Sequence, residues 1–254
     1  MEPRPDRSAW LKGGEARCTP EPQPRERPWR MVLLGAPGVG KGTQAELLAG
    51  RTGACALSTG DIFRAARSLD AGERSPALSQ ALERMQRGEL VSDATVLVIV
   101  SERLRCLDCK GGFLLDGFPR TLAQAEALDQ LLEREMIGLD AVLSYEMPIA
   151  EIVARLSGRR TCGKCKAVFH LAARPPRAEA VCDHCGGPLA QREDDRPEAV
   201  RVRMEAYEKD TAPLIQYYRR RGLLVSLAAD GTPEEILTRA VAALEALAPR
   251  VAPA

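Results

Sequence analysis

The stretch that most constrains the fold of this chain is residues 31–51. There a short apolar run, Met31–Leu34, leads into a glycine-rich turn and then into an amphipathic helix pattern. Glycines let consecutive backbone N–H groups curve around an anion, and the N-terminus of the helix adds the positive end of its dipole. The unit therefore predicts an α/β fold with a phosphate-binding turn made of Gly35, Ala36, Pro37, Gly38, Val39, Gly40, Lys41, Gly42 and Thr43.

This turn resembles the P-loop motif, in which a lysine reaches the terminal phosphates of a bound nucleotide. Lys41 occupies that position. The match departs from the strict pattern by one place, because Gly42 stands where the hydroxyl residue is expected and Thr43 follows it. A direct hydroxyl ligand to Mg²⁺ is therefore not expected from this turn.

Four more apolar runs follow, at residues 54–58, 112–116, 141–146 and 223–228, separated by helical patterns. This alternation predicts a five-stranded, doubly wound parallel sheet covered by helices on both faces. One helix is expected to open at Ser75 and Pro76 and to close at Gly88, and residues 232–235 read as a capping box. Asp116 ends the third strand, where it either faces a nucleotide-bound Mg²⁺ or simply forms a turn.

Two C-x-x-C pairs, separated by sixteen residues, predict a zinc site with four thiolate ligands: Cys162, Cys165, Cys182 and Cys185. With no open coordination position the metal would be structural, and it would stiffen a segment too small to own a core. Cys106 and Cys109 share the spacing but lack a second pair. We expect these two to be free thiols, in a reducing, cytoplasmic environment.

Composition narrows the class of protein. The 254 residues carry a formal net charge of +1, which suggests no bulk attraction to nucleic acid or to an anionic membrane. No apolar run approaches the roughly 20 residues of a membrane span. Residues 1–30 hold six prolines and no apolar period, so we expect a disordered extension without targeting features, with the first strand starting at Met31 and the extension dispensable.

Six blocks carry a family resemblance: "GAPGVGKGTQ", "STGDIFRAA" (58–66), "LLDGFPRTLAQAEAL" (114–128), "GRR" (158–160), "QREDDRPEAVRVRMEAY" (191–207) and "TAPLIQYY" (211–218). In this order they resemble adenylate kinase, in its bacterial form with a long, zinc-containing lid. The resemblance implies a P-loop NTPase fold with a mobile AMP-binding helical region and a small zinc-ribbon-like lid. It divides the chain into a core (31–57, 92–157 and 196–254), a nucleoside-monophosphate region (58–91) and a lid (158–195).

The resemblance also implies a reaction and residue roles. The reaction is the reversible, Mg²⁺-dependent conversion of ATP and AMP into two ADP, by a monomer holding one structural Zn²⁺. Catalytic roles fall to Lys41, Arg120, Arg159, Arg192, Arg203 and Asp116. ATP would be bound by residues 35–43, Arg155 and Arg159, and AMP by Thr59, Arg64, Glu89, Leu90, Val91, Gly117, Arg120, Gln124, Arg192 and Arg203. Asp194 and Asp195 would orient the lid arginines.

Two other functions are compatible with parts of this pattern. A P-loop protein whose zinc ribbon binds nucleic acid is disfavoured, because Phe169 is the only aromatic residue between the two cysteine pairs. A kinase for another nucleoside monophosphate shares the chemistry and differs in the acceptor pocket. The stretch from Arg64 to Gly88 is a few residues longer than is usual in the family, which leaves this alternative acceptor open.

Overall fold

The computed structural model of the chain describes residues 28–66, 72, 74–86, 91–101, 111–165, 167–172, 174–192 and 195–247. Its centre is a five-stranded sheet in which all neighbouring strands run parallel. The strand order is β2-β3-β1-β4-β8, with bounds β1 Trp29–Gly35, β2 Cys55–Ser58, β3 Gly112–Asp116, β4 Ala141–Glu146 and β8 Leu224–Ala228. The predicted fold class is confirmed.

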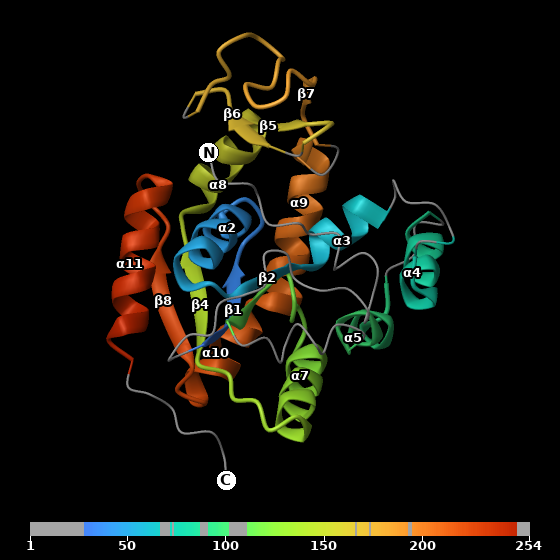
Figure 1. Ribbon diagram of the computed structural model, residues 1–254, viewed down its shortest axis with the longest axis vertical. Helices are drawn as coiled ribbons and strands as arrows, with labels where there is room; N and C mark the ends of the chain where they lie inside the picture. The colour runs from blue at the N-terminus through green and yellow to red at the C-terminus, as the bar shows by residue number, and fades with distance from the viewer. Residues whose placement is uncertain are drawn as a thin grey trace.

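Helices cover both faces of this sheet (Figure 1). On one face, α2 (Lys41–Thr52) and α11 (Pro233–Glu245) bury side chains such as Leu48 and Ile236 against the sheet. The other face packs against a buried cluster that includes α3 (Thr59–Ala66), α5 (Asp93–Ser101), α7 (Leu122–Arg134) and α10 (Pro213–Arg220), while α4 (Pro76–Gln86) packs on α3 and α5. Central strands covered on both sides need apolar residues throughout, which explains the continuous run Met31–Leu34 in β1.

The register of the strands brings their carboxyl ends to one edge of the sheet. Leu33 and Ser58 both pair with Asp116, and Gly35 pairs with Tyr145. The glycine-rich turn leaves the central strand β1 between the ends of β3 and β4. Ligands of open α/β sheets bind at this edge, so the fold places the predicted phosphate turn at the expected position.

A second, antiparallel sheet stands apart from the first, at the upper end of the molecule in Figure 1. It consists of β5 (Arg159–Cys162), β6 (Val168–His170) and β7 (Leu189–Ala190). Its small core contains Ala167, Phe169 and Leu189 together with two buried cysteines. The helices α8 (Ile149–Gly158) and α9 (Pro197–Ala206) connect it to the main body. We call this unit, residues 159–192, the small sheet unit.

Sequence signals at helix ends are confirmed where the structure describes them. At the start of α11, Thr232 N–H donates to Glu235 Oε2 at 2.8 Å and Glu235 N–H donates to Thr232 Oγ1 at 3.3 Å, which is the predicted capping box. The helix expected after Pro76 is α4. Within the described ranges, no helix combines the length and apolar character needed to cross a membrane.

The first strand begins two residues earlier than the expected Met31. Trp29 pairs with Gly112 and Arg30 with Phe113. The backbone of Arg30 also exchanges two hydrogen bonds with Asp140: its N–H donates to Oδ2 at 2.8 Å, and its C=O accepts from Asp140 N–H at 2.9 Å. Residues 29 and 30 are therefore part of the sheet and not of an extension. Cys106, Cys109 and residues 1–27 lie outside the described residues.

Candidate active site

The glycine-rich turn is shaped by close backbone approaches that only glycine permits. A Cβ on Gly35 would lie 2.6 Å from the carbonyl oxygen of Tyr145, and one on Gly38 would lie 2.6 to 2.9 Å from the side chain of Leu156. Gly40, the N-cap of α2, offers no side chain to cap the helix. The first N–H groups of α2 therefore point out of the helix start as donors for an anion.

Lys41, the first residue of α2, lies over this turn. Its Nζ donates to the carbonyls of Gly35 at 2.6 Å and Ala36 at 2.9 Å. Burial lowers the pKa of Lys41 to about 8, and the Asp116 carboxylate opposes this shift. Three guanidinium groups lower the pKa of Lys41 further, those of Arg120, Arg203 and Arg159. Cations from three separate segments therefore converge on one ammonium group, which favours a highly anionic ligand.

Asp116 faces the start of α2 from the end of β3. A Cβ on Gly42 would lie 3.7 Å from Asp116 Oδ2, so the glycine leaves space beside the carboxylate. Thr43, the next hydroxyl, is exposed. A carboxylate next to a phosphate-binding turn is the usual protein ligand of nucleotide-bound Mg²⁺. The residues present thus fit a Mg²⁺ ion held by Asp116 and phosphate oxygens.

A second cluster, made of hydrogen-bonded polar residues, surrounds the turn that follows β3. Thr59 Oγ1 and Arg120 Nε both donate to the carbonyl of Gly117, at 2.9 and 2.7 Å. The backbone N–H of Arg120 donates to Gln124 Oε1 at 2.8 Å. Sequence reasoning missed Thr211, whose hydroxyl donates to the carbonyl of Arg120 at 2.9 Å. Arg120 is therefore held at its N–H, its C=O and its side chain by three different segments.

Thr211 reaches Arg120 through an irregular turn. The segment η3 (Tyr207–Thr211) is a π-helical turn between α9 and α10, a local widening often found at functional sites. The only sequence signal for it was the block "TAPLIQYY", quoted above without a role for its threonine. Arg64 lies on α3, and its side chain is outside the described residues, as are Glu89, Leu90 and Asp194. Val91 is partly buried and precedes α5.

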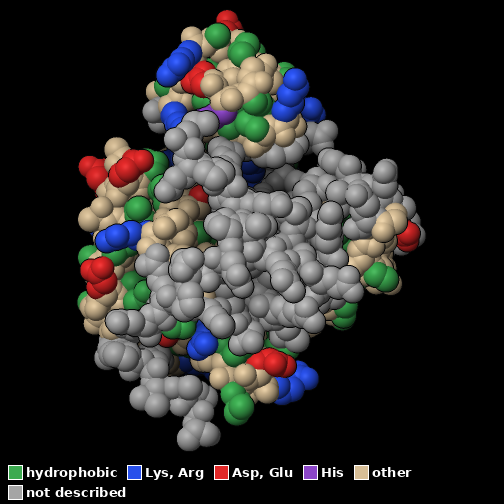
Figure 2. All heavy atoms as spheres, viewed as in Figure 1, with side chains coloured by type: hydrophobic (Ala, Val, Ile, Leu, Met, Phe, Trp, Pro, Cys, Tyr) green, Lys and Arg blue, Asp and Glu red, His purple; other side chains and the backbone are tan. Residues whose placement is uncertain are grey.

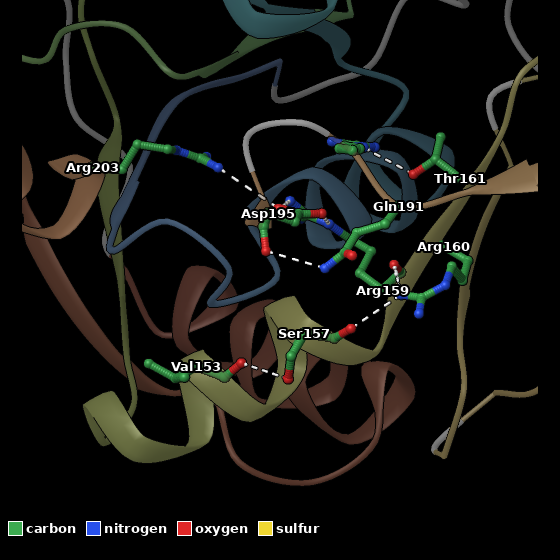
Figure 3. Close-up of polar contacts among 9 residues, drawn as sticks. Val153, Ser157, Arg159, Arg160, Thr161, Gln191, Asp195 and Arg203 are labelled. Atoms are coloured by element: carbon green, nitrogen blue, oxygen red, sulfur yellow. Dashed lines mark hydrogen bonds and ion pairs between the residues drawn. The ribbon is translucent and has the colours of Figure 1, made fainter. Parts of the chain in front are cut away.

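Asp195 pairs with arginines from two different elements, Arg159 of β5 and Arg203 of α9 (Figure 3). Arg159 forms a bidentate ion pair with Asp195, in which Nε lies 2.7 Å from Oδ2 and Nη2 also contacts Oδ1. Arg203, from α9, places Nη1 3.8 Å from Oδ1. Gln191 Nε2 donates to the Asp195 carbonyl at 3.2 Å, and Arg192 Nε donates to Thr161 Oγ1 at 2.9 Å. The Asp195 side chain is 0% exposed. It therefore holds Arg159 of the small sheet unit and Arg203 of α9 beside one buried carboxylate.

Arg155 and an open groove lie on the other side of the glycine turn. Arg155, on α8, places Nη1 3.5 Å from the carbonyl of Val39. The groove has a volume of about 480 Å³ and is lined by residues 146–148 and 226–228, at the carboxyl ends of β4 and β8. Sequence reasoning missed this groove, because pairing of Glu146 with Ala228 spans distant parts of the chain.

Four cysteines meet in the small sheet unit. The Sγ atoms of Cys162, Cys165, Cys182 and Cys185 all lie within 4.8 Å of one another. The distance is 3.5 Å between Cys162 and Cys185 and 3.6 Å between Cys165 and Cys182. A tetrahedral zinc site with Zn–S bonds of about 2.3 Å has S···S edges of roughly 3.8 Å. The donor set and spacing fit a closed Cys₄ zinc site.

Comparisons with known proteins agree on one family. The family model described as adenylate kinase matches residues 33–223. The chain is 53% identical to the adenylate kinase of Caldicellulosiruptor bescii over 196 residues, which cover 77% of this chain and 89% of that protein. It is 47% identical to the adenylate kinase of Thermodesulfovibrio yellowstonii (85% and 99% covered) and 48% identical to that of Streptomyces griseus (85% and 98% covered).

Proposed function

The chain belongs to the adenylate kinase family and is a nucleoside monophosphate kinase, and we propose that it transfers the terminal phosphoryl group of Mg²⁺-bound ATP to AMP, reversibly, to give two ADP. The observation that carries the proposal is the glycine-rich turn with Lys41 bonded over it, together with Arg120, Arg159 and Arg203, whose charges act on Lys41 from three different segments. Two nucleotides bring many negative charges together, and the transition state spreads charge over the transferred group. Fixed cations at that point lower the barrier without a covalent intermediate.

We place ATP, the phosphoryl donor, and AMP, the acceptor, on opposite sides of the cluster formed by Lys41 and the three arginines. ATP lies along the turn 35–43, with Arg155 and Arg159 beside it and its base toward the groove at β4 and β8. AMP lies between α3 and the turn after β3, where Thr59, Arg64, Gly117, Arg120 and Gln124 contact it and residues 89–91 line its base. Arg192 and Arg203 reach both phosphates. Asp116 would hold Mg²⁺ beside the nucleotide phosphates, and the ion would supply positive charge that neutralises the charge developing on the transferred group.

Movement of the small sheet unit completes the site. In the proposal, residues 158–195 form a lid over ATP, residues 58–91 close over AMP, and residues 31–57, 92–157 and 196–254 form the core. Cys162, Cys165, Cys182 and Cys185 would hold Zn²⁺, which would supply the rigidity that a core of a few side chains lacks. Arg159 and Arg192, on either side of the cysteines, then arrive as parts of one preformed body. The enzyme acts as a cytoplasmic monomer with no nucleic acid or membrane partner.

One assay tests the acceptor and the chemistry together. ADP formation from Mg²⁺-ATP is measured with AMP, GMP, CMP and UMP as acceptors, for the native chain and for Lys41→Ala. We expect AMP to be preferred, and turnover to collapse in a Lys41→Ala protein that still folds, because burial of the ammonium group, which lowers its pKa, costs stability and does not add to it. If another nucleoside monophosphate were used faster than AMP, that nucleotide would be assigned as the acceptor in its place. Near-normal turnover by Lys41→Ala would overturn the assigned mechanism.

The metal is tested separately. Elemental analysis of purified protein is expected to find one zinc per chain, and Cys162→Ser is expected to lose it while the five-stranded sheet stays folded. Activity of that variant should fall on warming before the main sheet unfolds, because only the small unit depends on the metal. Full zinc occupancy in Cys162→Ser would show that the ligand set is wrong.

A further inference from the structure

We propose that Asp93 fixes the orientation of the Gln124 side-chain amide, and that this fixed orientation makes the acceptor site accept adenine and reject 6-oxopurines such as hypoxanthine and guanine. The inference rests on the proposed function, because it requires Gln124 to face the base of the acceptor nucleotide. It adds Asp93, which sequence analysis did not single out, as a positioning residue that determines specificity.

Asp93 and Gln124 lie in the first turns of two packed helices, α5 and α7. Gln124 Nε2 donates to Asp93 Oδ1 at 2.6 Å. The other carboxylate oxygen, Oδ2, accepts from Thr121 Oγ1 at 2.9 Å. At the opposite end of the amide, Gln124 Oε1 accepts from the backbone N–H of Arg120 at 2.8 Å. Gln124 is only 5% exposed, so water does not readily replace these partners.

The two neighbours dictate the amide orientation independently. A carboxylate oxygen can only accept, so the atom facing Asp93 must be the nitrogen. A backbone N–H can only donate, so the atom facing Arg120 must be the oxygen. Rotating the amide by 180° would place oxygen against carboxylate and nitrogen against N–H, which leaves two buried repulsive contacts. Gln124 therefore cannot turn over to suit a different ligand.

The locked amide retains one N–H and one oxygen lone pair that have no partner among the described residues. Adenine presents an acceptor ring nitrogen next to its donor 6-amino group, which complements this pair. A 6-oxopurine carries an acceptor oxygen at that position and a donor at N1, so the pattern is reversed. A free amide would rotate to match it, but an amide held by Asp93 and Arg120 presents donor to donor.

The alternative is a purely structural role, in which Asp93 only stabilises the start of α5. Ser92 provides a matched control, because its hydroxyl caps the same helix by accepting from Thr95 N–H at 3.3 Å and also pairs with Thr95 Oγ1 at 2.9 Å. Neither contact involves Gln124. Ser92→Ala therefore weakens the helix start without releasing the amide, whereas Asp93→Ala releases it.

The experiment compares AMP with IMP, which differ only at positions 1 and 6 of the purine, as acceptors for the full chain with saturating Mg²⁺-ATP. The readout is the ratio of kcat/KM for AMP to kcat/KM for IMP. We expect Asp93→Ala to lower this ratio roughly tenfold or more, the size of one buried hydrogen bond. The KM for AMP should rise and IMP use should increase. Ser92→Ala should keep the ratio within about twofold of the native value while lowering the melting temperature.

A second variant keeps the test decisive if Asp93→Ala does not fold. Asp93→Asn preserves shape, but its amide can donate as well as accept, so rotation of Gln124 becomes less costly and the ratio should fall by a smaller factor. An unchanged ratio in folded Asp93 variants, or an equal fall in Ser92→Ala, would overturn the inference. If the native protein transfers no phosphoryl group to AMP, the proposed function itself fails, and the two failures are thereby distinguished.

Discussion

Replacing Asp195 by asparagine tests the arrangement of the arginines most directly. The substitution keeps the shape of the side chain and removes its charge, although that side chain is fully buried between Arg159 and Arg203. A hydrogen bond to a charged group contributes about 1.5 to 3 kcal/mol, and breaking a buried pair costs about 3 to 5 kcal/mol. The asparagine oxygen keeps one contact, and the Arg203 side chain is 35% exposed, so we expect the free energy of unfolding to fall by about 2 to 4 kcal/mol.

The catalytic effect of Asp195→Asn is expected to exceed the effect on substrate binding. Misplacing a cation by about 1 Å at the transferring group costs on the order of 100-fold in rate, so kcat should fall about 100-fold with a smaller change in KM for ATP. Urea denaturation and steady-state kinetics measure the two effects. Arg201→Ala is the control: its ion pair with Glu205, on the same helix, is 3.3 Å long with both side chains mostly exposed, so a change within about 0.5 kcal/mol is expected. Native kcat and stability in Asp195→Asn would refute the reasoning.

Four further outcomes are expected. ATP binding at pH 8.5 should take up a proton, because phosphates favour the ammonium form of Lys41, whose pKa is about 8 in the unliganded chain; calorimetry in buffers of different ionisation enthalpy measures the uptake, and Lys41→Arg should abolish it. The pKa of Lys41 in the folded chain lies below the ordinary 10.5, so between these two values Lys41 binds more protons in the unfolded chain than in the folded chain. The contribution of Lys41 to the free energy of unfolding should therefore rise with pH across this range, and urea denaturation at several pH values measures it. Thr211→Val should raise the KM for AMP severalfold with little change for ATP, and Thr211→Ser should restore it, because the hydroxyl holds the Arg120 carbonyl; equal changes for both nucleotides would contradict this. A chain starting at Met31 should melt several degrees below one starting at Pro28, since it loses strand pairs of β1; equal melting temperatures would show that those pairs add nothing.

The fold could be predicted because its signals are local. The continuous apolar run of β1, the alternation of strands and helices, and the Thr232 capping box each arise within a few residues. The sequence predicts the start of β1 two residues late, because a proline-rich stretch that ends at Pro28 directly precedes the strand and is not typical of one. The pairing that extends the strand comes from Gly112 and Phe113, and Asp140 adds hydrogen bonds to the Arg30 backbone, so all of these partners are distant in sequence.

The candidate site was only partly predictable for the same reason. Glycine spacing and cysteine spacing are visible in the sequence, and the structure brings the four thiols together. Asp93 and Thr211 carry no motif, and they matter through contacts with Gln124 and with the Arg120 backbone that span 31 and 91 positions. Such residues are found only once the chain has been folded in three dimensions.

The short distances within the cysteine cluster make the metal-free protein sensitive to oxidation by oxygen. Cys162 lies 3.5 Å from Cys185, and Cys165 lies 3.6 Å from Cys182, so each thiol has a neighbour from the opposite pair within a short movement of an S–S bond of about 2.05 Å. Zinc-bound thiolates are occupied, whereas a chain that has lost its metal would oxidise into two crossed disulfides. Adding zinc back would not reopen them, and recovery would require a thiol reductant first. A bound zinc ion would therefore also protect the thiolates from oxidation, and chelation without a reductant would not be reversed by zinc alone.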